Sequence, residues 1–514
     1  MTLFSTLPLG LGGSSIGAVL FVGGLISGLL VVIYRLTLHP LASFPGPKLA
    51  AATGLYETYF EVFKDGGGRY WAEIEEMHRI YGPIVRISPW EVHINDSDWN
   101  GVYKYSSKAA KPTWFYLRFF GMFPSTNSAE SHALHQQRRA PLNAYFASTN
   151  IQKFQPQAQG QIDKLVARLR AAEGSVVSLS DAFRCLATDI ATGFCFGRPF
   201  GHLDEPTFDH EFNLTVRTVV RASMWSRHSF GLFIPLMHSI PDSFQKKMNP
   251  AFSRIKWMKE TMSGCVSRSM HKAEPAPGEQ MDMVQTVLQS SLPAEEKTFL
   301  RLLSETRSVI MAGTETTASV LICITACLLR DPAMLAQLRQ ELVAAEAEVG
   351  FPINYTKLKE MPFLTGIVNE GLRVTNPTPS RLPRVCETQD LKYREWIIPR
   401  GTSISTTCQD VHNDPKIFER PLEFLPGRWE NLEARRALNK YLIPWGRGTR
   451  LCLGMELATM DLYCTVARIF SPSVGFDMTL FDTTDEDWKA YHEWFACFPK
   501  GKGLDVMIRR TGEA

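Results

Sequence analysis

The chain is 514 residues long, with 45% hydrophobic residues, 21% charged residues and a formal net charge of +3. Charge so close to balance gives no support for a nucleic-acid-binding protein. The ten cysteines are scattered singly without a C-x-x-C pair. This pattern argues against a zinc site or a disulfide scaffold and favours buried thiols in a reduced compartment.

The first predicted element is a membrane-spanning helix. Residues 1–34 contain no charged side chain, and the apolar run 14–34 is long enough to cross a bilayer. Arg35 and Lys48 follow the run, so the positive-inside rule places the rest of the chain on the cytoplasmic side. A cleaved signal peptide is the alternative, but the run is long and no basic residue precedes it. We therefore expect an uncleaved single-pass anchor over residues 1–37.

A proline-rich hinge is expected next, over residues 38–51. Pro40, Pro45 and Pro47 each fix their own φ angle and restrict the residue before them. The segment therefore predicts a stiff, extended spacer, with an ordinary proline-rich linker as the alternative.

The remaining chain, residues 52–514, shows no internal repeat and is dominated by helical patterns. The stretch 81–96 alternates apolar and polar residues, as a short hairpin does, and 378–410 has the texture of strands and turns. The expected helices cover 158–172, 181–194, 208–223, 250–270, 280–290, 296–330, 332–350 and 362–374. The fold class that follows is mainly α with small β-sheets, in one large domain behind the transmembrane helix.

The apolar stretch 308–329 carries one charge, Glu315, in its middle. A central carboxylate is costly in lipid, so a buried core helix fits better than a second membrane span. Gly313 costs about 1 kcal/mol relative to alanine within a helix, which suggests that something approaches the backbone there. Glu315 and Thr316 are then candidates for relaying protons to a bound ligand. The alternative is a Gly-Thr kink tolerated by packing, with Glu315 in a salt bridge.

Glu370 and Arg373 stand three residues apart in the otherwise apolar helix "FLTGIVNEGLRV". Such a pair is ordinarily an exposed stabiliser, but in this setting we expect it to be buried. A buried guanidinium needs a further partner, and Arg428 of "FLPGRW" is the candidate for that role.

The loop "WGRGTRLCLG" surrounds a single cysteine, Cys452, with glycines. A thiolate that binds iron needs a dry pocket and donors that hold its charge. Gly448 and Gly454 are expected to let the chain fold closely round the sulfur, and Arg450 to reach a carboxylate on a ligand. A helix starting near Leu453 would direct its N-terminal dipole at the sulfur. An inert cysteine in a turn is the alternative, and it leaves the glycines and the arginine unexplained.

Four motifs together resemble the cytochrome P-450 haem-thiolate monooxygenases. The cysteine loop F-x-x-G-x-R-x-C-x-G is matched by 445–454, and the helix motif A-G-x-D/E-T-T by 312–317. E-x-x-R is matched by Glu370 and Arg373, and P-x-R-F/W by 426–429. Their order and spacing agree over residues 40–505, and the cysteine loop is the most specific of the four.

The resemblance implies a haem b group with Cys452 as its axial iron ligand. It also implies that Glu315 and Thr316 deliver protons, and that Gly313 leaves room for dioxygen. The residues implied to surround the haem are Trp445, Gly448, Arg450, Gly454, Ala312, Gly313, His135, Arg139 and Arg384. Three positions depart from the family pattern: Trp445 replaces a phenylalanine, Gly427 a common glutamate, and His135 the tryptophan of W-x-x-x-R.

The resemblance further implies an electron-donating partner. No G-x-G-x-x-G or flavin fingerprint follows a strand, so electrons are expected from a separate NADPH-cytochrome P-450 reductase. Its acidic surface would meet Arg435, Arg436, Lys440 and Arg447, whose alternative interpretation is a solvated charge cluster. The anchor and "FPGPKLA" look most like filamentous-fungal members on the endoplasmic reticulum membrane, with a monomeric catalytic unit.

The expected substrate is an apolar secondary metabolite, terpenoid or polyketide-like, which reacts with O2. Its contacts are expected near 112–126, 223–238, 377–382 and 493–498, where Phe115, Phe119, Phe120 and Met122 suggest an apolar guest. These side chains equally suit a core or a membrane-facing surface. Two other functions stay open: a reductase-independent haem-thiolate isomerase or dehydratase, against which the intact A-G-T-E-T-T motif argues, and a non-catalytic haem- or ligand-binding membrane protein.

Overall fold

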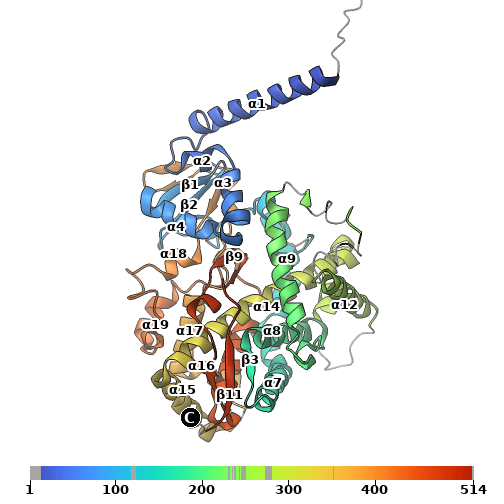
Figure 1. Ribbon diagram of the computed structural model, residues 1–514, viewed down its shortest axis with the longest axis vertical. Coiled ribbons are helices and arrows are strands. Elements are labelled where there is room, and N and C mark those ends of the chain that lie inside the picture. The colour runs from blue at the N-terminus through green and yellow to red at the C-terminus, as the bar shows by residue number, and fades with distance from the viewer. Residues whose placement is uncertain are drawn as a thin grey trace, which may run out of the picture.

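The computed structural model describes residues 13–116, 123–229, 232–233, 236, 239–241, 244, 251–272, 281–350 and 352–511. The described part is mainly helical with small sheets, as expected (Figure 1). The longer helices are α1 (Gly13–Thr37), α4 (Tyr70–Tyr81), α6 (His132–Tyr145), α7 (Ser148–Ala171), α8 (Leu179–Phe196), α9 (His210–His228), α12 (Ala251–His271), α14 (Phe299–Arg330), α15 (Pro332–Val349), α17 (Pro362–Thr375) and α20 (Met455–Phe470). The shorter ones are α2 (Lys48–Ala52), α3 (Leu55–Thr58), α5 (Thr113–Tyr116), α13 (Met283–Gln289), α16 (Tyr355–Glu360), α18 (Cys408–His412) and α19 (Leu432–Asn439).

Helix α1 projects from the body at the end opposite to the C-terminus (Figure 1). None of the most apolar window of its span Gly17–Thr37 is buried against the protein, whereas 72% of the less apolar window of α14 is buried. An unpacked apolar helix is compatible with a membrane anchor, and a buried one is a core helix. The interpretation of 308–329 as a core helix is therefore confirmed.

The segment after α1 is not the extended spacer that the prolines predict. Residues 38–44 form turns, and α2 begins at Lys48, directly after Pro47. Leu41 and Phe44 are buried, and the ring of Phe44 lies 4.9 Å from that of Trp396. Arg86 holds the segment from the other side, donating to the carbonyl oxygens of Arg35 and Leu41. Apolar contacts thus fold the hinge onto the body.

The described residues form four small sheets beside the helices. The first has the order β1 (Ile84–Ser88), β2 (Glu91–Ile94), β7 (Ser403–Ser405), β4 (Arg384–Val385), and its β1–β2 hairpin pairs Ile84 with Ile94 as the alternation in 81–96 predicts. The other sheets are β3 (Val176–Ser178), β11 (Asp505–Arg510), β8 (Phe476–Leu480); β5 (Leu391–Tyr393) with β6 (Trp396–Ile398); and β9 (His492–Trp494) with β10 (Ala496–Phe498).

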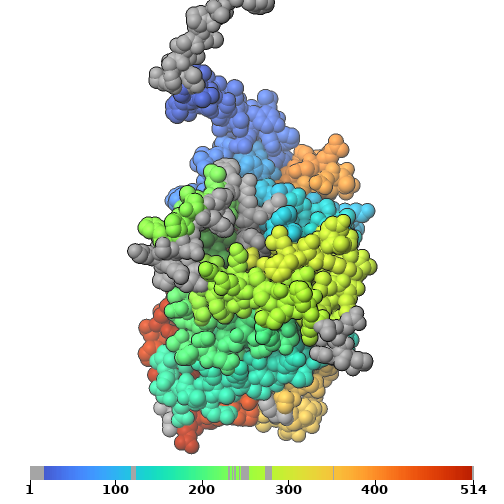
Figure 2. Space-filling model, turned by 90° about the vertical axis from the view of Figure 1, so that its right-hand side faces the viewer, coloured from blue at the N-terminus to red at the C-terminus, as the bar shows by residue number. Residues whose placement is uncertain are grey.

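The core forms around α14, which packs on α8 at one side and on α17 at another. At α17 the approach depends on Gly371, because a Cβ there would lie 2.5 Å from a side-chain carbon of Ile324 on α14. At α8 the hydroxyls of Thr188 and Thr314 are 2.9 Å apart. Figure 2 shows the outer face that α7, α9 and α12 contribute, with α1 extending beyond it.

Candidate active site

The middle of α14 is open on one side. Ala312 is exposed and Gly313 and Thr316 are half-buried, although Thr314, Glu315 and Thr317 beside them are buried. Ala312 and Thr316 are four residues apart and share one helix face, where the Thr316 hydroxyl donates to the Ala312 carbonyl oxygen at 2.7 Å. A core helix that exposes one face at its centre borders an internal space.

Gly313 faces helix α8. A Cβ at this position would lie 3.4 Å from the Cβ of Ala191 on α8, which is an ordinary van der Waals contact. The packing of α8 therefore does not by itself require a glycine here.

Glu315 points to α8, where it forms an ion pair with Arg184. Both hydrogen bonds of this pair are 2.8 Å long, and Arg184 also donates to the Ser180 carbonyl oxygen. Glu315 is thus salt-bridged, the second of its two sequence interpretations. Sequence reasoning missed Arg184, although a lone arginine inside the apolar helix "LSDAFRCLATDIATGF" was a signal for a buried ion pair.

Cys452 lies between the turn Gly448–Arg450 and the start of α20. Its backbone N–H donates to the carbonyl oxygen of Trp445 at 2.8 Å. The residue is exposed, yet burial raises the pKa of its thiol, while the Gly454 N–H bonded to the sulfur and the charge of Arg139 lower it. A side chain that is accessible and at the same time surrounded by protein faces an internal space.

The two glycines around Cys452 have different roles. Gly448 has a φ of +72°, and a Cβ there would lie 2.2 Å from the Tyr103 carbonyl oxygen, so only glycine fits. Gly454 has a φ of −85°, and a Cβ there would meet nothing within 4 Å. The expectation that Gly454 permits close chain folding is therefore wrong; its backbone N–H is the part that contacts the sulfur.

Five cationic or basic side chains gather around Arg450, two residues before Cys452. His135 and Arg139 stand one turn apart on α6, and Arg384 begins β4. Arg450 donates to the carbonyl oxygens of Ala129 and Glu130, at 2.6 and 2.8 Å. Lys111 donates to both oxygens of Asn127, and Arg384 to the Tyr116 hydroxyl at 2.6 Å.

This group is short of negative charge. Burial, helped by Arg384, lowers the pKa of Arg450 to about 9, and burial with Arg450 and Lys111 lowers that of His135 to about 2. In the described part of the chain no carboxylate forms an ion pair with any of the five. The Arg450 Nε and the His135 Nδ1 are buried without a hydrogen-bond partner. A ligand that brings two carboxylates, as haem does with its propionates, fits these donors.

The E-x-x-R pair is completely buried and is held from two directions. Arg373 donates to both carboxylate oxygens of Glu370, at 2.9 and 2.7 Å, and the rest of its guanidinium faces the carbonyl oxygens of His412, Pro421 and Glu423. Arg428 binds Glu370 at 3.1 Å, so its predicted role as partner of the Arg373 guanidinium is wrong. Like charges repel, and carbonyl oxygens satisfy Arg373 instead. Trp429, which sequence reasoning missed, donates to Glu370 at 2.8 Å.

The segments expected around the substrate carry a buried charge network. Arg381 donates to Glu57 and Glu91, and both Arg381 and Arg227 lie over the ring of Phe115. Sequence reasoning, which looked for apolar side chains, missed these charges. The other three residues named for an apolar guest, Phe119, Phe120 and Met122, lie outside the described residues.

The basic residues expected at a reductase surface are only partly free. Arg436 and Lys440 are exposed. Arg435 donates to the Trp429 carbonyl oxygen at 2.6 Å, and Arg447 to that of Lys440 at 3.2 Å. Two of the four side chains thus also brace the loop that leads to Cys452.

Comparisons with known proteins agree with this geometry. The family model described as cytochrome P450 matches residues 60–482. The chain is 34% identical to cytochrome P450 monooxygenase sdnE of Sordaria araneosa, over 94% of this chain and 95% of that protein. It is 35% identical to conidiogenone synthase PchP450 of Penicillium rubens, over 94% and 96%. It is also 35% identical to tryptophan 6-hydroxylase fscE of Fusarium equiseti, over 93% and 94%. The chain belongs to the cytochrome P450 family, whose haem is held by a cysteine thiolate, and it is a monooxygenase.

Proposed function

We propose that the protein inserts one oxygen atom of O2 into an apolar secondary metabolite, terpenoid or polyketide-like, with NADPH electrons from a separate cytochrome P-450 reductase. The observation that carries the proposal is that Cys452 is accessible just before α20 although protein surrounds its thiol. The open Ala312–Thr316 face of α14 supports it.

Haem, when bound, supplies the activation of dioxygen. Cys452 would bind the haem iron: burial raises the pKa of its thiol, and the Gly454 N–H and the positive charge of Arg139 act against this in favour of the thiolate form that binds iron. Arg450, Arg384, Arg139 and His135 would hold the propionates. Burial weakens the hydration of the three arginines, so their pairing with carboxylates is strong.

Proton handling would fall to Thr316. Its Oγ1 lies on the open face, holds its proton toward the Ala312 carbonyl oxygen, and keeps lone pairs free to accept from water. Glu315, held in its pair with Arg184, would act on the proton supply only by leaving that pair.

An apolar guest is supported by the chemistry of the open face. Ala312 offers a methyl group, Gly313 its backbone and Thr316 one hydroxyl, and the nearby carboxylate of Glu315 is turned to Arg184. Two relatives at 35% identity, a conidiogenone synthase and a tryptophan 6-hydroxylase, have names that refer to different compounds.

We place the anchor at residues 1–37 and the catalytic domain at 52–514, joined by 38–51, in the endoplasmic reticulum membrane. The unpacked apolar surface of α1 supports an anchor. The exposed Arg436 and Lys440 support docking of an acidic reductase beside the Cys452 loop.

Reconstitution with a cytochrome P-450 reductase tests the proposal. The expected result is NADPH- and O2-dependent conversion of an apolar metabolite, identified by comparing extracts of a strain with and without the gene. Conversion without NADPH would make the protein an isomerase or dehydratase, and haem binding without any conversion would make it a ligand-binding protein. Either result overturns the proposal.

A further inference from the structure

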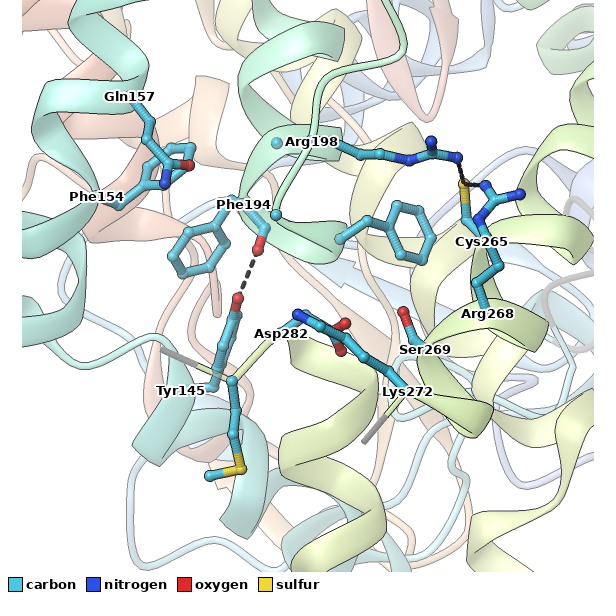
Figure 3. Close-up of a pocket in the computed structure, with 14 residues that line it drawn as sticks. Tyr145, Phe154, Gln157, Phe194, Arg198, Cys265, Arg268, Ser269, Lys272 and Asp282 are labelled. Carbon is cyan, nitrogen blue, oxygen red and sulfur yellow. Dashed lines mark hydrogen bonds between the residues drawn. The ribbon is translucent and has the colours of Figure 1, made fainter. Parts of the chain in front are cut away.

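A second cavity, of about 530 Å³, lies between α7, α8, α12 and the start of α13 (Figure 3). Its apolar lining comes from Tyr145, Phe154, Phe194, Phe196 and Met281. Ligand sites for drug-sized molecules fall within the same range of volumes, and they combine such a lining with a few polar groups.

This cavity is separate from the Cys452 site. Helix α8 lies between the two, because its Ala191 meets Gly313 of α14, whereas its Gly193 and Phe194 line the second cavity. Ala191 and Gly193 are two positions apart on the helix, so they point to different sides of it. A molecule in this cavity would therefore not contact the open face of α14.

Two arginines from different elements converge on one sulfur in this cavity. Arg198 follows the end of α8, and Arg268 lies one turn beyond Cys265 on α12. Their Nη2 atoms lie 3.6 and 3.1 Å from the Cys265 Sγ, and Figure 3 shows both guanidinium groups meeting there. A thiol is a weak acceptor, so this contact positions the two guanidinium groups without neutralising them.

The cavity carries an excess of positive charge. Burial raises the pKa of the Cys265 thiol, which keeps it neutral. Within the described ranges, neither Arg198 nor Arg268 has an ion pair with a carboxylate. Asp282 is the one acid among the residues that line the cavity. One of its carboxylate oxygens accepts from the Gln285 N–H at 2.9 Å as the N-cap of α13, so a single carboxylate stands against two guanidinium groups.

We propose that this cavity binds an aromatic small molecule with one acidic group, its rings on the apolar lining and its carboxylate between Arg198 and Arg268. A guanidinium is a planar fork that matches a carboxylate with two parallel hydrogen bonds. Edge-to-face contacts with Phe154, Phe194 and Phe196 favour rings over a saturated chain. The site is peripheral to the monooxygenase centre and does not depend on the identity of the substrate.

Calorimetric titration of the haem-loaded protein with 2-naphthoate tests this assignment. The neutral amide of the same shape, 2-naphthamide, serves as the matched ligand. We expect one naphthoate site whose affinity falls with rising salt, a Soret band that does not shift, and binding of the amide at least tenfold weaker. An equally tight amide, no heat of binding at millimolar naphthoate, or a Soret shift that tracks binding would overturn the proposal.

The variants Arg198→Gln and Arg268→Gln, combined, locate the site. We expect the affinity for naphthoate to fall at least tenfold, while Arg400→Gln, at an exposed arginine far along the chain, leaves it unchanged. Retention of the haem spectrum shows that the double variant is folded. Unchanged affinity in a folded double variant would contradict the assignment. If the double variant loses its haem, the proposal is decided by the affinities of the unmodified protein for 2-naphthoate and 2-naphthamide.

Discussion

Glu315 and Arg184 join helices α14 and α8 through two hydrogen bonds of 2.8 Å, one residue away from Thr316. Their side chains are only 5% and 12% exposed. The pair therefore fixes the height and rotation of the helix segment that presents Thr316 to the internal space. It also keeps a full negative charge off the open face.

Breaking this pair should destabilise the fold strongly. Glu315→Gln leaves the Arg184 charge buried without compensation, which costs about 3–5 kcal/mol of unfolding free energy. The double variant with Arg184→Gln should recover part of that loss, and urea unfolding of the haem-loaded protein measures all three proteins. The exposed pair Lys500–Glu486 is the control, where Glu486→Gln should cost about 0.5 kcal/mol or less. Equal losses at the two sites would contradict this account.

Replacing Thr316 should leave NADPH consumption in place while product formation falls. Thr316→Ala removes the hydroxyl on the open face, so we expect product formation per NADPH to fall about 10²-fold, within the range of a lost proton-transfer group. Thr316→Ser should restore most of the yield because it keeps the hydroxyl. The measurement is the amount of product formed per NADPH consumed, with the reductase present. A Thr316→Ala enzyme with an unchanged ratio would show that the hydroxyl has no role in proton transfer.

Gly448 should tolerate no side chain. Gly448→Ala places a Cβ 2.2 Å from the Tyr103 carbonyl oxygen on a backbone with a φ of +72°. We expect a loss of at least about 1–3 kcal/mol in stability together with a lower haem content. Gly160→Ala is the matched control, since it lies on an exposed part of α7 with nothing within 4 Å and should stabilise the protein by up to about 1 kcal/mol. Thermal unfolding and haem absorbance compare the two, and an alanine at 448 that is as harmless as one at 160 would refute the prediction.

His412 should make the fold acid-sensitive. Its ring is fully buried and its Nε2 accepts from the Ile443 N–H at 3.0 Å, and burial, helped by Arg373, lowers its pKa to about 3. The unfolded chain takes up this proton below about pH 6.5, whereas the folded protein does not. The histidine therefore contributes stability that is full above that pH and is lost as the pH falls toward 3, at up to about 1.4 kcal/mol per pH unit.

Replacement of the ring checks this dependence. The free energy of unfolding, obtained from urea titrations, falls as the pH is lowered from 6.5 to 5. His412→Gln should reduce the slope of this fall by the contribution of one proton, while His271→Gln, at an exposed histidine, should not change it. Parallel curves for His412→Gln and the parent protein would show that another group controls the acid response.

The parts of the site that lie close together in sequence could be predicted, and those that meet across the fold could not. The cysteine loop, the α14 motif and the E-x-x-R pair depend on local spacing, so Cys452, Thr316, Glu370 and Arg373 were found directly. Arg184 is 131 residues from Glu315, so its place in an apolar helix could indicate a buried ion pair but not which carboxylate it meets.

The direction in which a side chain points was the second feature that could not be predicted from the sequence. The sequence places Arg428 near the E-x-x-R pair, but only the packed structure decides that it binds the carboxylate while carbonyl oxygens surround Arg373. The prediction of an extended hinge was wrong for a related reason. Prolines predict a stiff spacer, and burial of Leu41 and Phe44 then folds that spacer onto the sheet. Tertiary contacts override local preference at both places.

The most direct test is the carbon-monoxide difference spectrum of reduced membranes that contain the protein. We expect the thiolate-type Soret band from the parent protein, no such band from Cys452→Ala, and an unchanged band from Cys386→Ala, at a partly exposed cysteine outside the site. A parent protein without haem, or a thiolate-type band that persists in Cys452→Ala, would contradict the assignment of Cys452 as the iron ligand.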